Sequence, residues 1–405
     1  MKEYKKTPRK VAHAIQIFYF STQIRIVMKI AIAIDSFKGS LSSKDAEKAV
    51  EEAIRSILPE CETICIPIAD GGEGTLSVIM EITGATLHTI HAHNPRMEII
   101  PTQYGISTDG ETAFIEMATI SGLPLIQKEQ QNPMETTTFG TGELILDALQ
   151  KGCTRFIVGI GGSATNDAGT GMLQALGFKF LNHEGKPLKQ GGKILIDIES
   201  IDHSEVSPLL KNAHFIVGCD VRNPFYGPEG SAFVYARQKG ADDSMIIELD
   251  KGLQSFANVI KRETGKDISQ IPGSGAAGGL GGGMLAFLNA ELKSGAELLL
   301  ESCHFEEKIS NADLIITGEG RIDRQSLMGK IPGKILQIAH KHNIPVIAIS
   351  GIAQDWNLLK QAGFKDIYTT KPDSMTIEEA MKPGIAKQNL KNTILSIFSQ
   401  PANFD

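Results

Sequence analysis

The chain has 405 residues, enough for two or three domains or for one large α/β unit with a sizeable core. Hydrophobic residues make up 41% and charged residues 21%, and the formal net charge of −7 argues against a general nucleic-acid or membrane binder. Glycine is over-represented: 41 of the 405 residues are glycine, about a tenth of the chain, against a usual share of roughly 7%. Because the glycines gather in loops instead of recurring at a fixed period, collagen and repeat architectures are excluded.

The first 27 residues differ from the rest. Their basic start and apolar middle suggest a secretory signal, but Gln16, Gln23 and Arg25 interrupt the apolar run and no small-residue cleavage site closes it. The run is also too short and too polar to span a bilayer. Because "MKIAIAID" begins a strand directly at Met28, we expect residues 1–27 to be upstream sequence that lies outside the fold.

The five cysteines favour free thiols in a cytoplasmic protein. They are odd in number and mostly lie inside apolar runs. Cys61 and Cys65 are the only close pair, and no second pair with zinc spacing accompanies them. A structural zinc site is therefore not expected.

From Met28 onwards, apolar runs of strand length alternate with amphipathic segments of helix length, which is typical of a parallel sheet covered on both faces. The predicted strands are "KIAIAID" (29–35), "TICIPIAD" (63–70), "RFIVGIGG" (155–162), "HFIVGCD" (214–220), "DLIITGEG" (313–320) and "PVIAISG" (345–351). The predicted helices cover residues 43–57, 73–82, 141–151, 166–176 and 333–342. Residues 85–125 alternate apolar and polar side chains, which predicts antiparallel or mixed strands.

These patterns predict an α/β fold with a Rossmann-like parallel-sheet domain that is split in sequence and a second α/β domain inserted into it. The first domain is expected to comprise residues 28–93 and 295–402, and the inserted domain residues 94–294. No low-complexity linker separates the two.

Four predicted strands end with an acidic residue that is followed by glycines or turn residues. These acidic residues are Asp35, Asp70, Asp220 and Glu319. Ligands of open α/β sheets bind beyond the carboxyl ends of the strands. Helix capping explains a single acidic residue at such a place, whereas four of them beside glycine-rich turns are what Mg²⁺ and phosphate groups need together.

The stretch "GGSATND" (161–167) turns a predicted strand into a predicted helix. Free N–H groups, the hydroxyls of Ser163 and Thr165 and the positive end of the helix would then favour an anion. The alternative is that Asn166 or Asp167 simply caps the helix. A second glycine cluster, "PGSGAAGGLGGGM" (272–284), favours anion binding, because each glycine costs backbone entropy.

Six blocks of the sequence carry a resemblance to a known family. They are "DSFKGSLS" (35–42), "ADGGEGT" (69–75), "GGSATNDAGTGMLQALG" (161–177), "GCDVRNP" (218–224), "GAAGGLGGG" (275–283) and "TGEGRIDRQSLMGK" (317–330). In content and order they resemble the signature blocks of the bacterial type 1 glycerate kinase family, over nearly the whole chain from Met28. The resemblance implies ATP-dependent phosphorylation of D-glycerate, usually at the 2-hydroxyl, with Mg²⁺ and an active site in the cleft between two domains. Residues 1–27 depart from the family, which does not normally carry them.

The resemblance and the chemistry of phosphoryl transfer together suggest roles for individual residues. We expect one of Lys38 and Arg321 to neutralise the transferring phosphate and the other to bind the substrate carboxylate. Asp70 or Asp220 is expected to orient the glycerate hydroxyl and accept its proton. The expected Mg²⁺ ligands are Asp167, Glu319 and Asp323. The expected nucleotide- and phosphate-binding residues are Gly71, Gly72, Gly161, Gly162, Ser163, Thr165, Gly275, Gly278 and Gly279.

Two other classes of function compete with a kinase. The run "GSGAAG" (273–278) matches G-x-G-x-x-G, and Glu297 lies about where an acidic ribose contact would, so the alternative is a nicotinamide-dependent oxidoreductase acting on a small hydroxy acid. A non-enzymatic sugar-acid sensor would not need the acidic strand ends. The expected partners are D-glycerate and ATP, with no nucleic acid and no membrane, and a homodimer is the candidate assembly. The sequence leaves 2- and 3-phosphoglycerate open as products.

Overall fold

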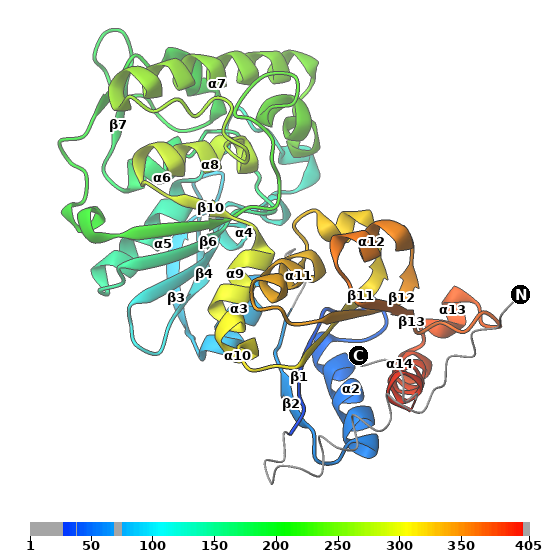
Figure 1. The fold of residues 1–405 in the computed structure, drawn as a ribbon. Coiled ribbons are helices and arrows are strands. Elements are labelled where there is room, and N and C mark those ends of the chain that lie inside the picture. Colours follow the sequence, from blue (N-terminus) through cyan, green and yellow to red (C-terminus); the bar gives the residue numbers. More distant parts are fainter. Residues whose placement is uncertain (1–26, 38, 69–74, 400–405) are drawn as a thin grey trace, which may run out of the picture. The chain divides into compact units, whose positions relative to one another are not determined.

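The computed structural model describes residues 27–37, 39–68 and 75–399 (Figure 1). The chain divides into two compact units, each built from separate stretches of sequence. Among the described residues, unit 1 comprises residues 27–37, 39–66, 308–321 and 339–399, and unit 2 comprises residues 67–68, 75–307 and 322–338.

Unit 1 is built on a five-stranded sheet in the order β13-β12-β11-β1-β2. Its strands are β1 (Lys29–Ile34), β2 (Glu62–Cys65), β11 (Leu314–Ile322), β12 (Val346–Ala353) and β13 (Asp366–Thr369). β1 pairs in parallel with β11 and β2, and β12 pairs in parallel with β13. The run KIAIAI of β1 is almost wholly buried, as expected for a central strand of a parallel sheet. Ile34 pairs with Gly318, so β1 and β11 carry their following residues to the same edge.

Helices of unit 1 complete its core. They are α2 (Ser43–Ile57), α12 (Trp356–Ala362), α13 (Ile377–Ala380) and α14 (Pro383–Phe398). α2 and α14 pack side by side, and their apolar residues share one buried cluster with β1, β11 and β12 (Figure 1). Ser42 caps α2: its hydroxyl oxygen accepts the backbone N–H of Asp45 at 3.1 Å and its O–H donates to the Asp45 carboxylate at 2.7 Å.

Unit 2 is built on a six-stranded sheet in the order β10-β9-β6-β5-β4-β3. Its strands are β3 (Thr86–His93), β4 (Ile99–Ile106), β5 (Thr112–Glu116), β6 (Arg155–Gly159), β9 (His214–Gly218) and β10 (Glu291–Lys293). The pairs from β10 to β5 are parallel, whereas β4 is antiparallel to both β5 and β3. The mixed strands predicted for residues 85–125 are thus confirmed.

Unit 2 also contains helices and a small hairpin, and two of the helices run on into unit 1. The helices are α3 (Thr75–Thr83), α4 (Ala118–Ser121), α5 (Phe139–Gln150), α6 (Thr170–Ala175), α7 (Asp243–Thr264), α8 (Ala276–Phe287), α9 (Gly295–Ser302), α10 (Phe305–Ile309) and α11 (Ile331–Lys341). The hairpin joins β7 (Lys179–Leu181) to β8 (Ser200–Asp202). Short helical turns are η1 (Leu123–Leu125), η2 (Lys128–Gln130), η3 (Gly192–Asp197), η4 (Pro208–Asn212), η5 (Ala232–Ala236), η6 (Arg237–Lys239) and η7 (Arg324–Leu327). α10 and α11 each begin in unit 2 and end in unit 1.

The predicted α/β class, with a parallel-sheet part split in sequence, is confirmed. All six predicted strands occur as β1, β2, β6, β9, β11 and β12, and the five predicted helices occur as α2, α3, α5, α6 and α11. The bounds of the two units differ from the expected domains: β3, placed in the first domain by sequence, pairs with β4 in unit 2. Residues 295–307 and 322–338 likewise belong to unit 2. The domain bounds themselves stay a prediction.

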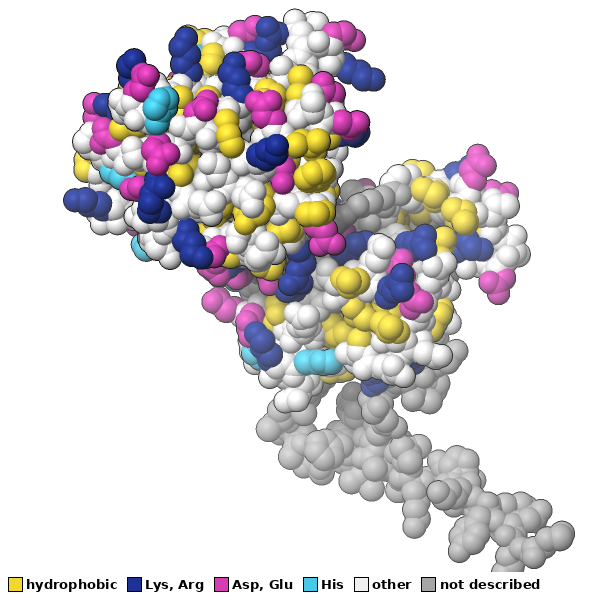
Figure 2. All heavy atoms as spheres, turned by 90° about the horizontal axis from the view of Figure 1, so that it is seen from above, with side chains coloured by type: hydrophobic (Ala, Val, Ile, Leu, Met, Phe, Trp, Pro, Cys, Tyr) yellow, Lys and Arg dark blue, Asp and Glu magenta, His cyan; other side chains and the backbone are white. Residues whose placement is uncertain are grey.

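The cysteines are free thiols, with Cys153 and Cys303 buried and the other three half-buried. Within the described residues, no helix is both long and apolar enough to cross a membrane. Figure 2 shows acidic and basic side chains interspersed over the face in view.

Candidate functional site

A cavity of about 350 Å³ lies in unit 2 at the carboxyl ends of three neighbouring strands. Glu116 ends β5, Gly159 ends β6 and Gly218 ends β9, and the register pairs Glu116 with Gly159 and Gly159 with Gly218. The cavity is lined by Leu76, Glu116, Leu123, Gly159–Ser163, Gly218–Val221, Tyr235, Gln238, Lys239, Ala276, Ala277, Gly295 and Leu298. This is the place where ligands of open α/β sheets bind.

The first glycine loop forms one wall of this cavity. Gly161, Gly162 and Ser163, all predicted from the sequence, are among its lining residues. Two backbone hydrogen bonds fix the loop to residues 121–123: the Leu123 N–H donates to the Gly162 carbonyl at 2.9 Å, and the Ala164 N–H donates to the Ser121 carbonyl at 3.0 Å. An ideal Cβ on Gly161 would contact no atom within 4 Å, so packing within the protein does not require a glycine at this position.

Lys239 reaches the same loop from η6. Its side chain is 2% exposed, and its ammonium donates to Ser163 Oγ and to the Thr165 carbonyl, both at 2.7 Å. Burial lowers the pKa of Lys239 to about 7, and the charge of Asp167 opposes this shift. Thr165, a predicted phosphate-binding residue, is fully buried and is linked to the cavity through Lys239.

Asp167 occupies the start of α6. The helix begins at Thr170 instead of at residue 166, after Gly169 in the left-handed region at φ 78°. Asp167 is fully buried; its Oδ1 accepts Gly169 N–H at 3.1 Å and its Oδ2 accepts Gly171 N–H at 3.2 Å. Oδ2 also accepts the backbone N–H and the hydroxyl of Thr138, at 2.8 and 2.9 Å.

These contacts match the capping alternative for Asp167, because its carboxylate takes N–H groups at the start of this helix. Anion binding by the loop that precedes it stays a prediction. Burial raises the pKa of Asp167, although the hydrogen bonds from Thr138, Gly169 and Gly171 act to lower it. The contacts show a structural role for Asp167, and its role as a metal ligand stays a prediction.

Two carboxylates line the cavity. Asp220 follows β9, is exposed, and accepts the backbone N–H of Gly295 on Oδ1 at 2.9 Å. Glu116 is half-buried and its carboxylate lies against Gly159, where an ideal Cβ would be 2.9 Å from Oε1. Tyr235, another lining residue, donates its hydroxyl to Asn223 Oδ1 at 2.5 Å.

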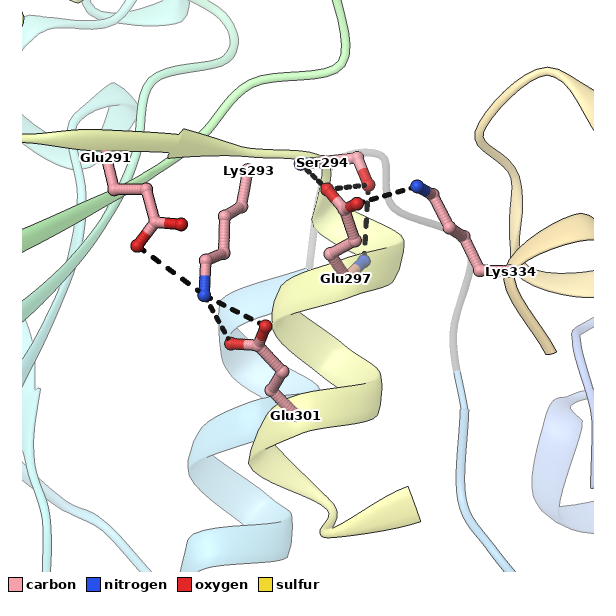
Figure 3. A network of polar contacts seen from close by, with 6 residues as sticks. All are labelled: Glu291, Lys293, Ser294, Glu297, Glu301 and Lys334. Atoms are coloured by element: carbon pink, nitrogen blue, oxygen red, sulfur yellow. Dashed lines mark hydrogen bonds and ion pairs between the residues drawn. The ribbon is translucent and has the colours of Figure 1, made fainter. Parts of the chain in front are cut away.

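A polar network fixes the start of α9, which contributes Gly295 and Leu298 to the cavity (Figure 3). Ser294 and Glu297 form a capping box, and Lys334 of α11 donates to Glu297 Oε1 at 2.6 Å. Burial acts to raise the pKa of Glu297, but the hydrogen bonds from Lys334 and Ser294 outweigh it and lower the pKa. Beside them, Lys293 bridges Glu301 at 2.8 Å and Glu291 at 3.7 Å (Figure 3).

The second glycine cluster serves close packing. At Gly278, φ is +72° and an ideal Cβ would lie 2.0 Å from the Thr165 carbonyl oxygen. At Gly279 an ideal Cβ would lie 2.9 Å from the ring of Phe225. Gly275, Gly278 and Gly279 are buried, while the neighbouring Ala276 and Ala277 line the cavity. The phosphate-binding role of these three glycines stays a prediction.

Three predicted residues meet at one edge of the unit 1 sheet. Asp35 follows β1 and is 3% exposed, and its backbone N–H donates to Gly318 at 2.8 Å. Glu319, 8% exposed, and the exposed Arg321 lie on the last part of β11. Arg321 donates to Gln354 Oε1 at 2.7 Å.

Other predicted residues lie elsewhere. Asp323 caps η7, where its Oδ1 accepts Gln325 N–H at 2.8 Å. Lys38, Asp70, Gly71 and Gly72 lie outside the described residues. In the part of the chain that the structure describes, no three His, Cys, Asp or Glu residues gather as a metal site.

Glu116 and Lys239 were missed by the sequence argument. Glu116 ends a strand, but no glycine-rich turn follows it, and the alternating pattern of residues 85–125 indicated antiparallel strands. Lys239 carries no local signal, because its burial depends on a loop 76 residues away.

Comparison with known proteins gives one consistent result. Residues 30–400 match the sequence pattern of the glycerate kinase family. A glycerate kinase of Halalkalibacterium halodurans is 44% identical over 356 residues, which cover 88% of this chain and 94% of that protein. A glycerate 2-kinase of Escherichia coli strain K12 is also 44% identical, over 88% of this chain and 93% of that protein.

A solved structure agrees. The crystal structure of a protein assigned as glycerate kinase 2 from Salmonella typhimurium LT2 is 40% identical, with a TM-score of 0.78, over 92% of this chain and 98% of that chain. The oxidoreductase alternative finds no support in these relatives. Glu297, which that alternative needs for ribose, is instead held by Ser294 and Lys334.

Proposed function

The chain belongs to the glycerate kinase family and is a kinase that phosphorylates glycerate, and we propose that it transfers a phosphoryl group from ATP, with Mg²⁺, to the 2-hydroxyl of D-glycerate. The observation that carries the finer proposal is the cavity of unit 2, where an open glycine loop and two carboxylates meet at the ends of parallel strands. Phosphoryl transfer depends mainly on positioning and charge neutralisation. The loop N–H groups provide positioning, and the carboxylates can hold the Mg²⁺ that would neutralise the phosphate charge.

In this proposal the backbone N–H groups of Gly161, Gly162 and Ser163 bind phosphoryl oxygens, since nothing at Gly161 blocks their approach. Asp220 orients the glycerate hydroxyl and accepts its proton, because its carboxylate is exposed to the cavity and fixed by Gly295. Of Lys38 and Arg321, one is proposed to act at the phosphate and the other at the substrate carboxylate. Lys38 and Asp70 lie outside the described residues.

The residues of the cavity fit a magnesium–nucleotide complex. Mg²⁺ takes one or two carboxylates together with phosphate oxygens, so a cage of three protein ligands is not required. Glu116 would hold the ion here, and Glu319 and Asp323 stay candidate ligands. When bound, Mg²⁺ neutralises the charge on the transferring phosphate.

The proposal is tested by incubating the full chain with ¹³C-labelled D-glycerate, ATP and Mg²⁺ and identifying the product by NMR. Carbon–phosphorus coupling distinguishes 2-phosphoglycerate from 3-phosphoglycerate. We expect the 2-phosphate, no product with EDTA and little product with L-glycerate. Formation of the 3-phosphate would refute the regiochemistry, and full turnover with EDTA would refute the role of the metal.

The matched variant for this assay is Asp220→Asn. It keeps the size and polarity of the side chain but cannot accept the hydroxyl proton at neutral pH, so turnover should fall on the order of a hundredfold or more. Turnover at the wild-type rate would remove Asp220 from the proposed chemistry.

A further inference from the structure

Lys239, a buried cation of the cavity wall, has no carboxylate partner among the described residues. Lys239 makes two hydrogen bonds, to a hydroxyl and to a carbonyl, and among the described residues it forms no ion pair. A buried charge is costly unless a counter-charge compensates it. The one charge that acts on Lys239 is that of Asp167, whose oxygens are taken by Thr138, Gly169 and Gly171.

We propose that Lys239 binds an anionic oxygen of a substrate in this cavity, while it holds the Ser163 hydroxyl and the Thr165 carbonyl in position. An ammonium has three N–H donors, and two of them are used within the protein. Lys239 lines the cavity, and in this proposal its third donor binds the ligand there. The ligand chemistry is a small oxyanion: a phosphoryl group of the nucleotide or the carboxylate of glycerate.

This assignment rests on the proposed function only for the identity of the two substrates. It adds a positively charged group to the glycine loop, which otherwise offers neutral N–H groups and hydroxyls. A ligand bound to Lys239 would also affect the conformation of the loop, because the same ammonium donates to the Ser163 hydroxyl and to the Thr165 carbonyl.

The experiment compares Lys239→Met, Lys239→Arg and the wild-type chain. Methionine keeps the length and apolar stem but removes the charge and the donors. Calorimetric titrations with D-glycerate alone and with a non-hydrolysable Mg·ATP analogue alone identify the source of the oxyanion. We expect Lys239→Met to weaken one of the two titrations at least tenfold, to lower kcat/KM at least a hundredfold, and to leave Tm within a few degrees of wild type.

The matched control is Lys266→Met. Lys266 is a half-buried lysine of unit 2. Like Lys239, it donates to backbone carbonyls, those of Leu285 and Ala286 at 3.1 and 2.9 Å, and burial lowers its pKa. It is not among the residues that line the cavity. We expect this variant to change Tm but not KM, kcat or either titration.

A pH profile separates charge from structure. A ligand oxyanion favours the protonated ammonium, so wild-type affinity is complete below pH about 7 and falls as the pH rises above it, whereas Lys239→Met and Lys239→Arg show no such fall. The charged group that acts on this ammonium is Asp167. The titratable groups elsewhere on the cavity lining are Glu116, Cys219, Asp220 and Tyr235, and burial raises the pKa values of Cys219 and Tyr235 further from neutrality.

The outcomes distinguish the two levels of the proposal. If wild type binds both ligands but Lys239→Met binds them equally well and keeps wild-type kcat/KM, the role of Lys239 is refuted. A lower Tm with unchanged affinity and unchanged pH profile would also refute it, because that is what a purely structural lysine predicts. If wild type itself forms no phosphoglycerate, the proposed function fails independently of Lys239.

Discussion

Replacing Asp167 by alanine should destabilise unit 2 strongly. The carboxylate accepts three backbone N–H groups, from Thr138, Gly169 and Gly171, and all lie in buried surroundings. Each buried donor left without an acceptor costs about 1–3 kcal/mol. The sum is reduced because the buried carboxylate is itself poorly solvated, as its raised pKa indicates. A net loss of at least about 3 kcal/mol is expected, or a Tm lower by roughly 6–12 °C for a unit of this size.

Scanning calorimetry of the full chain measures this effect. Asp167→Asn should cost less, because one oxygen still accepts hydrogen bonds, and Asp220→Ala serves as the control for an exposed carboxylate of the same unit. If Asp167 were chiefly a metal ligand, its removal would leave Tm unchanged or raised without added metal. An unchanged Tm in Asp167→Ala would therefore refute the structural role argued from its hydrogen bonds.

Three further predictions concern the two units separately. Gly161→Val adds bulk toward the cavity, so it should abolish turnover in a coupled kinase assay at an unchanged Tm. Gly384 on α14 is an exposed glycine with equally open surroundings, so the control variant Gly384→Val should leave turnover intact. Burial raises the pKa of Glu47 from 4.5 to about 8, so the native state keeps a proton that the unfolded chain releases. The stability of the wild-type protein should therefore decrease as the pH rises from 4.5 to 8. Glu47→Gln should have a higher Tm than the wild type at pH 8 but not at pH 4.5. Equal Tm values at pH 8 would contradict this. Arg321→Ala should lower kcat on the order of a hundredfold, as expected for a lost charge-stabilising group. Its Tm should change little, because the Arg321 side chain is exposed. A wild-type kcat in this variant would exclude Arg321 from the site.

Features set by local sequence were predicted well. The apolar run of β1 and the helix over residues 43–57 need only neighbouring residues, and both occur where the pattern places them. The start of α6 was displaced because Asp167 folds back onto Gly169 and Gly171, a contact that competes with helix formation at residues 166–169.

Features that depend on packing between distant segments were not visible in the sequence. The sequence predicts Gly278 as a phosphate-binding residue. In the structure this glycine packs so closely against the backbone of Thr165 that no Cβ would fit. The sequence gives no signal at Lys239, because this lysine is buried against the glycine loop only in the folded chain. Sequence therefore located the loop that lines the cavity but not the side chain that supports it.

The central claim is that the glycine-loop cavity of unit 2 receives a substrate anion. A crystal structure of the full chain with D-glycerate and a non-hydrolysable Mg·ATP analogue tests it most directly. The account predicts an oxyanion within hydrogen-bond distance of Lys239 Nζ and of backbone N–H groups in residues 161–163. Both ligands bound elsewhere, with this cavity filled only by water, would contradict it.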